Sequence, residues 1–166
     1  MLQIHNSLTR AKEVFVPLTP GVIRMYVCGM TVQDVPHVGH LRSSIVGDTI
    51  RRFLEWRGYK VTFVYNFTDV DDKIIAKAAE EGTTFREVAR RNEELFLRYA
   101  RALNIKPATH YPRATEHIDD ILRLIGELIA QGKVARPYLG VRTMTINPSV
   151  AASSRTNTGH RWVSAL

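Results

Sequence analysis

Two histidines flanking a glycine, in the run Pro36-His37-Val38-Gly39-His40, have the residue types and spacing best suited to chemistry in this sequence. An apolar run precedes them and helically spaced residues follow, so we expect a helix to begin near His40 or Leu41. Free N–H groups and the positive end of the helix dipole would bind phosphate there. Gly39 would admit the nucleotide backbone closely, and the imidazoles would donate to growing phosphate charge. Taken alone, the run fits two solvated turn histidines equally well.

Cys28 lies just before this turn and is the only cysteine of the chain. It cannot form an internal disulfide, which is typical of proteins of the reducing cytoplasm. As a functional residue it would be a thiol or a metal ligand, and otherwise a small buried residue at a strand end. Asp69, Asp71 and Asp72 allow a divalent-metal cluster, but acids stabilising the start of a helix are the favoured interpretation.

The elements that must position these residues alternate between strand and helix. Apolar runs predict strands over Gly21–Cys28 and Val61–Phe67. Helical periodicity predicts helices over Leu41–Arg57, Asp69–Glu81, from Thr84 onward, and over about 115–131. This order is typical of a parallel α/β domain with helices on both faces, whose ligands bind at the carboxyl ends of the strands. The apolar residues expected to face the core are Ile45, Val46, Ile50, Phe53, Leu54 and Trp56 in the first helix, and Ile118, Ile121, Leu122, Ile125, Leu128 and Ile129 in the last.

Composition limits the class of protein. The chain has 166 residues, of which 45% are hydrophobic and 23% charged, as in a soluble globular domain. No apolar run approaches the roughly 18 residues of a membrane span. The formal net charge is +7, but no acidic residue follows Glu127 while five basic residues do. The excess charge therefore fits a patch for nucleic-acid phosphates or a basic tail equally well.

Several separated blocks, matching in order, resemble the cysteinyl-tRNA synthetases, class I aminoacyl-tRNA synthetases in which His-x-Gly-His occurs at the first strand–helix turn. The blocks are Asn6-Ser7-Leu8-Thr9-Arg10, Met25-Tyr26-Val27-Cys28-Gly29, Asn66-Phe67-Thr68-Asp69-Val70-Asp71-Asp72-Lys73 and Pro112-Arg113-Ala114-Thr115-Glu116-His117-Ile118. The resemblance implies that residues 1–134 are the N-terminal portion of a Rossmann-like class I catalytic domain. Residues 135–166 are expected to be a divergent, poorly ordered tail, with one or two strands possible over 134–146.

The resemblance also implies an activity and its site residues. The family activates L-cysteine with ATP and Mg²⁺ to cysteinyl-adenylate and passes the cysteinyl group to tRNA(Cys); we expect a cytoplasmic monomer. The implied catalytic residues are His37 and His40, which would contact the ATP phosphates with Gly39, while Thr31 lies beside ATP and Gly29 and Thr68 line the amino-acid pocket. Cys28 matches the first ligand of a zinc ion that would select cysteine over serine by taking its softer sulfur. The block around His117 is expected to open a helix rather than to supply a base.

The sequence also departs from the family pattern. Gln33 stands where tyrosine is usual, which puts local pocket detail in doubt. The second signature Lys-Met-Ser-Lys-Ser and a second cysteine for zinc do not occur in these 166 residues, so the chain is expected to be truncated and incomplete for turnover. Two alternatives stay open. One is a cysteine–amino-sugar ligase of the same fold, and the other is a non-catalytic remnant that binds ATP or tRNA.

Overall fold

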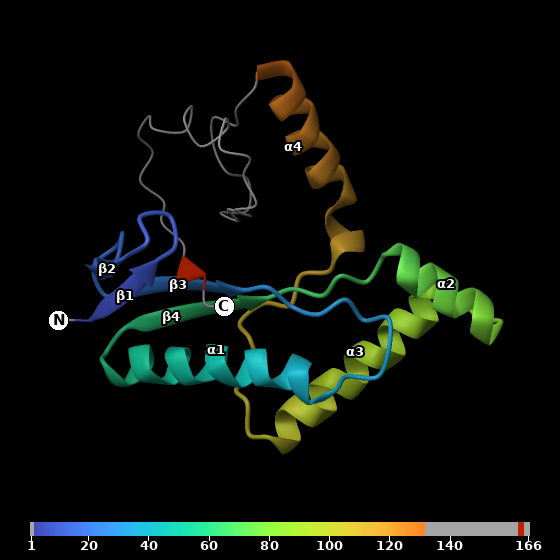
Figure 1. Cartoon of the computed structure of the whole chain (residues 1–166), viewed down its shortest axis with the longest axis horizontal. Coiled ribbons are helices and arrows are strands. Elements are labelled where there is room, and N and C mark those ends of the chain that lie inside the picture. Colours follow the sequence, from blue (N-terminus) through green and yellow to red (C-terminus); the bar gives the residue numbers. More distant parts are fainter. Residues whose placement is uncertain (1, 132–162, 165–166) are drawn as a thin grey trace.

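The computed structural model describes residues 2–131 together with 163 and 164 (Figure 1). It begins with an antiparallel hairpin of β1 (Gln3–Asn6) and β2 (Ala11–Val14), in which Gln3 lies opposite Val14. The side-chain oxygen of Asn6 closes the turn by accepting from the Leu8 N–H at 3.0 Å. Sequence analysis did not predict this hairpin, because its short, largely exposed strands lack an apolar alternation.

A parallel sheet forms the centre of the molecule. The strands β3 (Val22–Val27) and β4 (Lys60–Tyr65) pair in parallel, from Val22 opposite Lys60 to Val27 opposite Tyr65. The short β5 (Val163–Ser164) pairs with the other side of β3, giving the order β4-β3-β5. The helix α1 (Val38–Trp56) connects β3 to β4 and lies along the sheet (Figure 1). The predicted α/β class and both predicted strands are therefore confirmed.

The helix starts follow their capping residues. α2 (Asp72–Glu81) begins three residues later than predicted, because Asp71 has extended backbone and its side chain caps the helix through the Lys73 N–H. Gly82, with φ of 65°, ends α2 as predicted. Thr84 caps α3 (Phe85–Ala102), also as predicted, by accepting from the Glu87 N–H at 3.2 Å.

The buried face of α1 differs from the predicted one. Trp56 is 77% exposed and Phe53 40% exposed, and Ile45 and Val46 are also exposed. The residues that face the interior are instead Leu41, Ser44, Gly47, Asp48 and Leu54. A Cβ at Gly47 would lie only 3.1 Å from a methyl group of Val27, so the helix axis runs very close to the sheet. Close approach selects small side chains on this face, whereas apolar periodicity reports only hydrophobicity.

The last helix was also predicted wrongly in its packing. A 3-10 turn, η1 (Ala114–His117), leads into α4 (Ile118–Gln131), which projects away from the sheet (Figure 1). Within the described part of the chain, α4 packs only against η1. All six apolar residues expected to face inward are therefore exposed, from 39% at Ile121 to 81% at Ile129. No described helix is long and apolar enough to span a bilayer.

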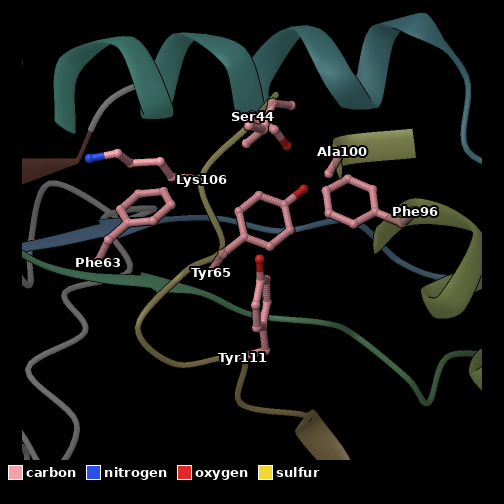
Figure 2. Close-up of a pocket in the computed structure, with 8 residues that line it drawn as sticks. Ser44, Phe63, Tyr65, Phe96, Ala100, Lys106 and Tyr111 are labelled. Carbon is pink, nitrogen blue, oxygen red and sulfur yellow. The ribbon is translucent and has the colours of Figure 1, made fainter. Parts of the chain in front are cut away.

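An aromatic cluster joins α3 to the sheet. The rings of Tyr65 and Phe96 stack with centroids 5.2 Å apart, and those of Phe67 and Tyr111 stack at 5.6 Å. These rings surround a small cavity beneath Ser44 of α1, into which the Tyr65 hydroxyl points (Figure 2). Burial raises the pKa of Tyr65, while a hydrogen bond with Ser44 acts in the opposite direction. The cavity belongs to the packed core rather than to a ligand site.

The predicted domain boundary between residues 134 and 135 lies outside the described residues. So do the strands expected over 134–146 and most of the tail expected over 135–166. Val163 and Ser164 are the part of that segment that the structure describes, and they form β5.

Candidate functional site

The loops that follow β3 and β4 continue the pairing of the two strands. Thr31 and Thr68 form an isolated parallel bridge. The Val32 N–H donates to the Thr68 carbonyl at 3.2 Å, and the Thr68 N–H donates to the Met30 carbonyl at 3.1 Å. Thr31 and Thr68, which the sequence assigned to neighbouring parts of one site, therefore lie side by side at the carboxyl ends of the strands.

Gly29 sits where only a glycine fits. A Cβ on this residue would lie 1.5 Å from the backbone oxygen of Asn66. The Gly29 N–H and the Tyr26 hydroxyl both donate to the side-chain oxygen of Asn66, each at 2.8 Å. Burial, followed by the nearby Cys28, raises the pKa of Tyr26 to about 12, so this phenol stays a donor at neutral pH. The amide of Asn66 thus joins the end of β3 to the end of β4, a role that sequence reasoning missed.

The two predicted histidines lie at the start of α1, which begins at Val38 rather than near His40 or Leu41. His37 is the N-cap, and its Nδ1 accepts from the Gly39 N–H at 3.0 Å. The His37 N–H in turn donates to Nδ1 of His40 at 3.2 Å. The imidazole rings stack with centroids 3.9 Å apart. The histidines therefore form a reciprocal capping box, which is why the helix starts earlier than predicted.

This capping box sets the proton positions of both rings. Because each Nδ1 accepts a hydrogen bond, each neutral imidazole carries its proton on Nε2. Burial, and then the charge of His37, lowers the pKa of His40, so this ring is neutral at pH 7. A Cβ at Gly39 would lie 2.9 Å from Cε1 of His37, so Gly39 makes room for that ring. The turn thus presents two Nε2–H donors at a helix N-terminus.

Cys28 ends β3 with an exposed thiol, so the alternative of a small buried residue is wrong. Its Sγ lies 3.8 Å from the Gly29 carbonyl oxygen. Zinc needs three or four ligands, yet the described residues contain no group of three or more His, Cys, Asp and Glu side chains that could hold a metal ion. The residues around Cys28 in the described chain therefore do not fit a zinc site.

The acidic block after β4 is structural in this fold, as the favoured interpretation held. Asp71 caps α2, and Asp72 lies in its first turn. Asp69 is 8% exposed and accepts hydrogen bonds from both the N–H, at 3.0 Å, and the hydroxyl of Thr115. His117 ends η1 with its Nδ1 3.2 Å from an Asp120 oxygen. These contacts join the loop after β4 to the turn that opens α4.

Helix α3 supplies two further buried polar residues that sequence reasoning missed. Asn92 is fully buried and donates to the Val32 carbonyl at 3.1 Å. Glu93 accepts two hydrogen bonds from the Arg113 guanidinium, at 2.8 and 2.5 Å, and these contacts raise the pKa of Arg113. Two adjacent polar residues within an amphipathic helix were the available signal, but their partners lie 60 and 20 positions away in the chain.

Gln33, the position at which the sequence departs from its family pattern, lies beside an open cleft between the loop after β3 and α2. The other residues of this cleft are Asp34, Lys73, Ala76, Lys77 and Glu80. Its volume is about 600 Å³ with open solvent included. Charges of both signs line it, so it favours neither an anionic nor a cationic ligand.

Comparisons with known proteins match most of the chain. The family model of the class I (C) tRNA synthetase catalytic domain matches residues 14–144. The cysteine–tRNA ligases of Limosilactobacillus reuteri and Pyrococcus furiosus are each 53% identical over 132 residues, which are 80% of this chain and 28% of each relative. Methionyl-tRNA synthetase of Mycobacterium tuberculosis, solved with methionyl-adenylate, superposes with a TM-score of 0.60 at 31% identity, over 66% of this chain and 22% of that one. The chain thus spans less than a third of these relatives' length.

Proposed function

The chain belongs to the class I (C) tRNA synthetase family, and from this premise we propose that it carries the ATP-binding part of a cysteine–tRNA ligase. The reaction joins the carboxylate of L-cysteine to the α-phosphate of ATP, releases pyrophosphate, and then passes the cysteinyl group to tRNA(Cys). The observation that carries the proposal is the histidine capping box at the start of α1, beside the paired loops of Thr31 and Thr68.

The proposed role of the histidines is to bind phosphate through hydrogen bonds. Neutral rings that accept at Nδ1 have only Nε2–H to offer, and this group donates to anionic oxygens. The favourable charge comes from the N-terminus of α1, whose dipole acts within the first turn. In-line attack on the α-phosphate requires positioning and stabilisation of charge rather than a nucleophilic side chain. His37 and His40 would supply that stabilisation together with the helix.

The proposed amino-acid pocket lies against the ends of β3 and β4. Gly29 contributes only backbone to this wall, because the Asn66 carbonyl occupies the place of a side chain. Thr68 is paired through its main chain to Met30 and Val32, and Thr31 lies opposite it, toward the proposed ATP site. No step of this proposal uses a metal at Cys28. The exposed thiol suits a reducing compartment, and we propose that the enzyme acts in the cytoplasm.

Isothermal titration tests the proposal on this chain. The ligands are MgATP and a non-hydrolysable sulfamoyl analogue of cysteinyl-adenylate, with the seryl analogue for comparison. We expect binding of MgATP, tighter binding of the cysteinyl analogue, and a loss of at least about tenfold in affinity, or about 1.4 kcal/mol, in the His37→Ala/His40→Ala variant. His5→Ala, at an exposed histidine of β1, is the matched control.

Two outcomes would contradict the proposal. Equal heats for the wild-type chain and the double histidine variant would remove the phosphate role of the capping box. Binding of the cysteinyl analogue with no response to tRNA(Cys), but with a response to an amino-sugar acceptor, would instead support the ligase alternative. Both acceptors can be titrated into the same analogue-bound sample.

A further inference from the structure

We propose that Asn92 of α3 is a positioning residue for the adenylate site, holding the loop after β3 at the spacing from the loop after β4 that the ligand requires. This inference rests on the proposed function, because the two loops carry Thr31 and Thr68. Asn92 lies in the interior behind these loops, and its role is to fix their main chains.

The first argument is the chemistry of the buried carboxamide. Asn92 is 0% exposed, and its Nδ2 donates to the Val32 carbonyl at 3.1 Å. Its Oδ1 is the one fully buried side-chain atom in the described part of the chain that lacks a hydrogen-bond partner. Buried polar groups are nearly always satisfied, and a leucine of similar shape would pack here without an orphaned acceptor. Packing alone therefore does not account for an asparagine at this position, whereas holding the Val32 carbonyl does.

The second argument is what Val32 does. Its N–H donates to the Thr68 carbonyl at 3.2 Å, and its carbonyl accepts from Asn92. Both polar groups of this one residue are thus used, one toward the opposite loop and one toward α3. Val32 is itself 0% exposed, so water cannot replace either bond. The position of the adjacent Thr31 then depends on α3 as well as on the sheet.

The third argument is that the next residue of α3 holds the opposite loop. Glu93 binds the Arg113 guanidinium through two hydrogen bonds. Arg113 precedes η1, in which Thr115 donates its N–H to Asp69 at 3.0 Å. Asp69 follows Thr68 directly. Consecutive residues of α3 thus hold the two loops from behind, and the helix serves as their common frame.

Amide hydrogen exchange, followed by NMR on the full chain, tests the clamp. In Asn92→Leu we expect the Val32 and Thr68 amides to exchange about tenfold faster, because one hydrogen bond that orders the loop is lost. The amides of β3 and β4 should keep their wild-type rates. Ile23→Val, a mild change in the core at the start of β3, is the matched control and should not favour the loop amides. Unchanged exchange at Val32 and Thr68 would overturn the inference.

Ligand affinity supplies the readout that a merely structural residue would not move. We expect Asn92→Leu to bind the cysteinyl-adenylate analogue at least about tenfold more weakly while its Tm stays close to that of the wild type. Equal affinity in the two proteins would overturn the positioning role. If the wild-type chain binds no analogue, the proposed function fails, and the exchange rates still decide whether Asn92 holds the loop. Asn92→Ala, compared in the same way, serves if the leucine variant does not fold.

Discussion

The histidine turn and the paired loops lie at the same end of the sheet but are held in opposite ways. The turn is held by bonds between residues two and three positions apart, from Gly39 to His37 and from His37 to His40. The loops are held by partners 37, 46 and 60 positions apart, which are Gly29 with Asn66, Asp69 with Thr115, and Val32 with Asn92. The phosphate end of the proposed site is therefore local structure, whereas its amino-acid end depends on the whole fold.

If this distinction is correct, Gly29→Ala should have the largest effect. Its Cβ would overlap the Asn66 carbonyl, which is backbone and cannot move without separating the two strand ends. We expect a loss of about 3 kcal/mol or more in the free energy of unfolding, measured by urea denaturation. Gly126→Ala in α4, where a Cβ meets nothing within 4 Å, is the control and should gain up to about 1 kcal/mol. Similar values for the two variants would refute the long-range origin of the loop geometry.

Arg113→Ala should come second. It leaves the Glu93 carboxylate, whose side chain is 10% exposed, without its cation and also releases η1. Since Arg113 is itself 38% exposed, solvent offsets part of the loss, and we expect about 2 kcal/mol. The same denaturation experiment measures it. Arg90→Ala on the outer face of α3, with partners 59% and 63% exposed, should change stability by less than about 0.5 kcal/mol.

Changes at His37 should separate the local cap from the ligand. His37→Ala removes the N-cap acceptor of α1, with an expected cost of about 1 kcal/mol. His37→Asn should keep most of that stability, because asparagine is a preferred N-cap residue, but it lacks the Nε2–H donor. We therefore expect the asparagine variant to unfold near the wild-type urea midpoint and yet to bind MgATP more weakly. Full MgATP affinity in His37→Asn would confine His37 to capping.

The smallest effect is expected from pH. The pKa of His40 is lowered from its ordinary value of 6.5 in the folded chain, so protonation favours the unfolded state. Its contribution to stability is complete above that value and is lost as the pH falls toward and through the lowered pKa. Thermal unfolding at pH 7.5 and pH 5.5 should show a decrease in Tm that is smaller in His40→Gln. Glu55, whose pKa lies below its ordinary 4.5 because of Lys106, should not contribute in this window.

The elements that depend on neighbouring residues could be predicted. The strands over 21–28 and 61–67, the Thr84 cap and the Gly82 stop all follow from local propensity and turn chemistry. Asp69 shows where this reasoning ends. It was grouped with Asp71 and Asp72 as a helix-start acid, and only Asp71 and Asp72 serve α2. Asp69 turns instead to Thr115, because the fold brings η1 against it.

The sequence by itself determined the α/β class, the family, and a histidine pair at the first strand–helix turn, because these are written in short motifs and local periodicity. The tertiary structure alone decided which face of α1 is buried, that α4 exposes its apolar side chains, and that Asn66 and Asn92 hold the site loops. The physical reason is that hydrophobic spacing reports how apolar a face is. The distance between packed elements, and the polar groups left over at their ends, then select which side chains fit and bond there.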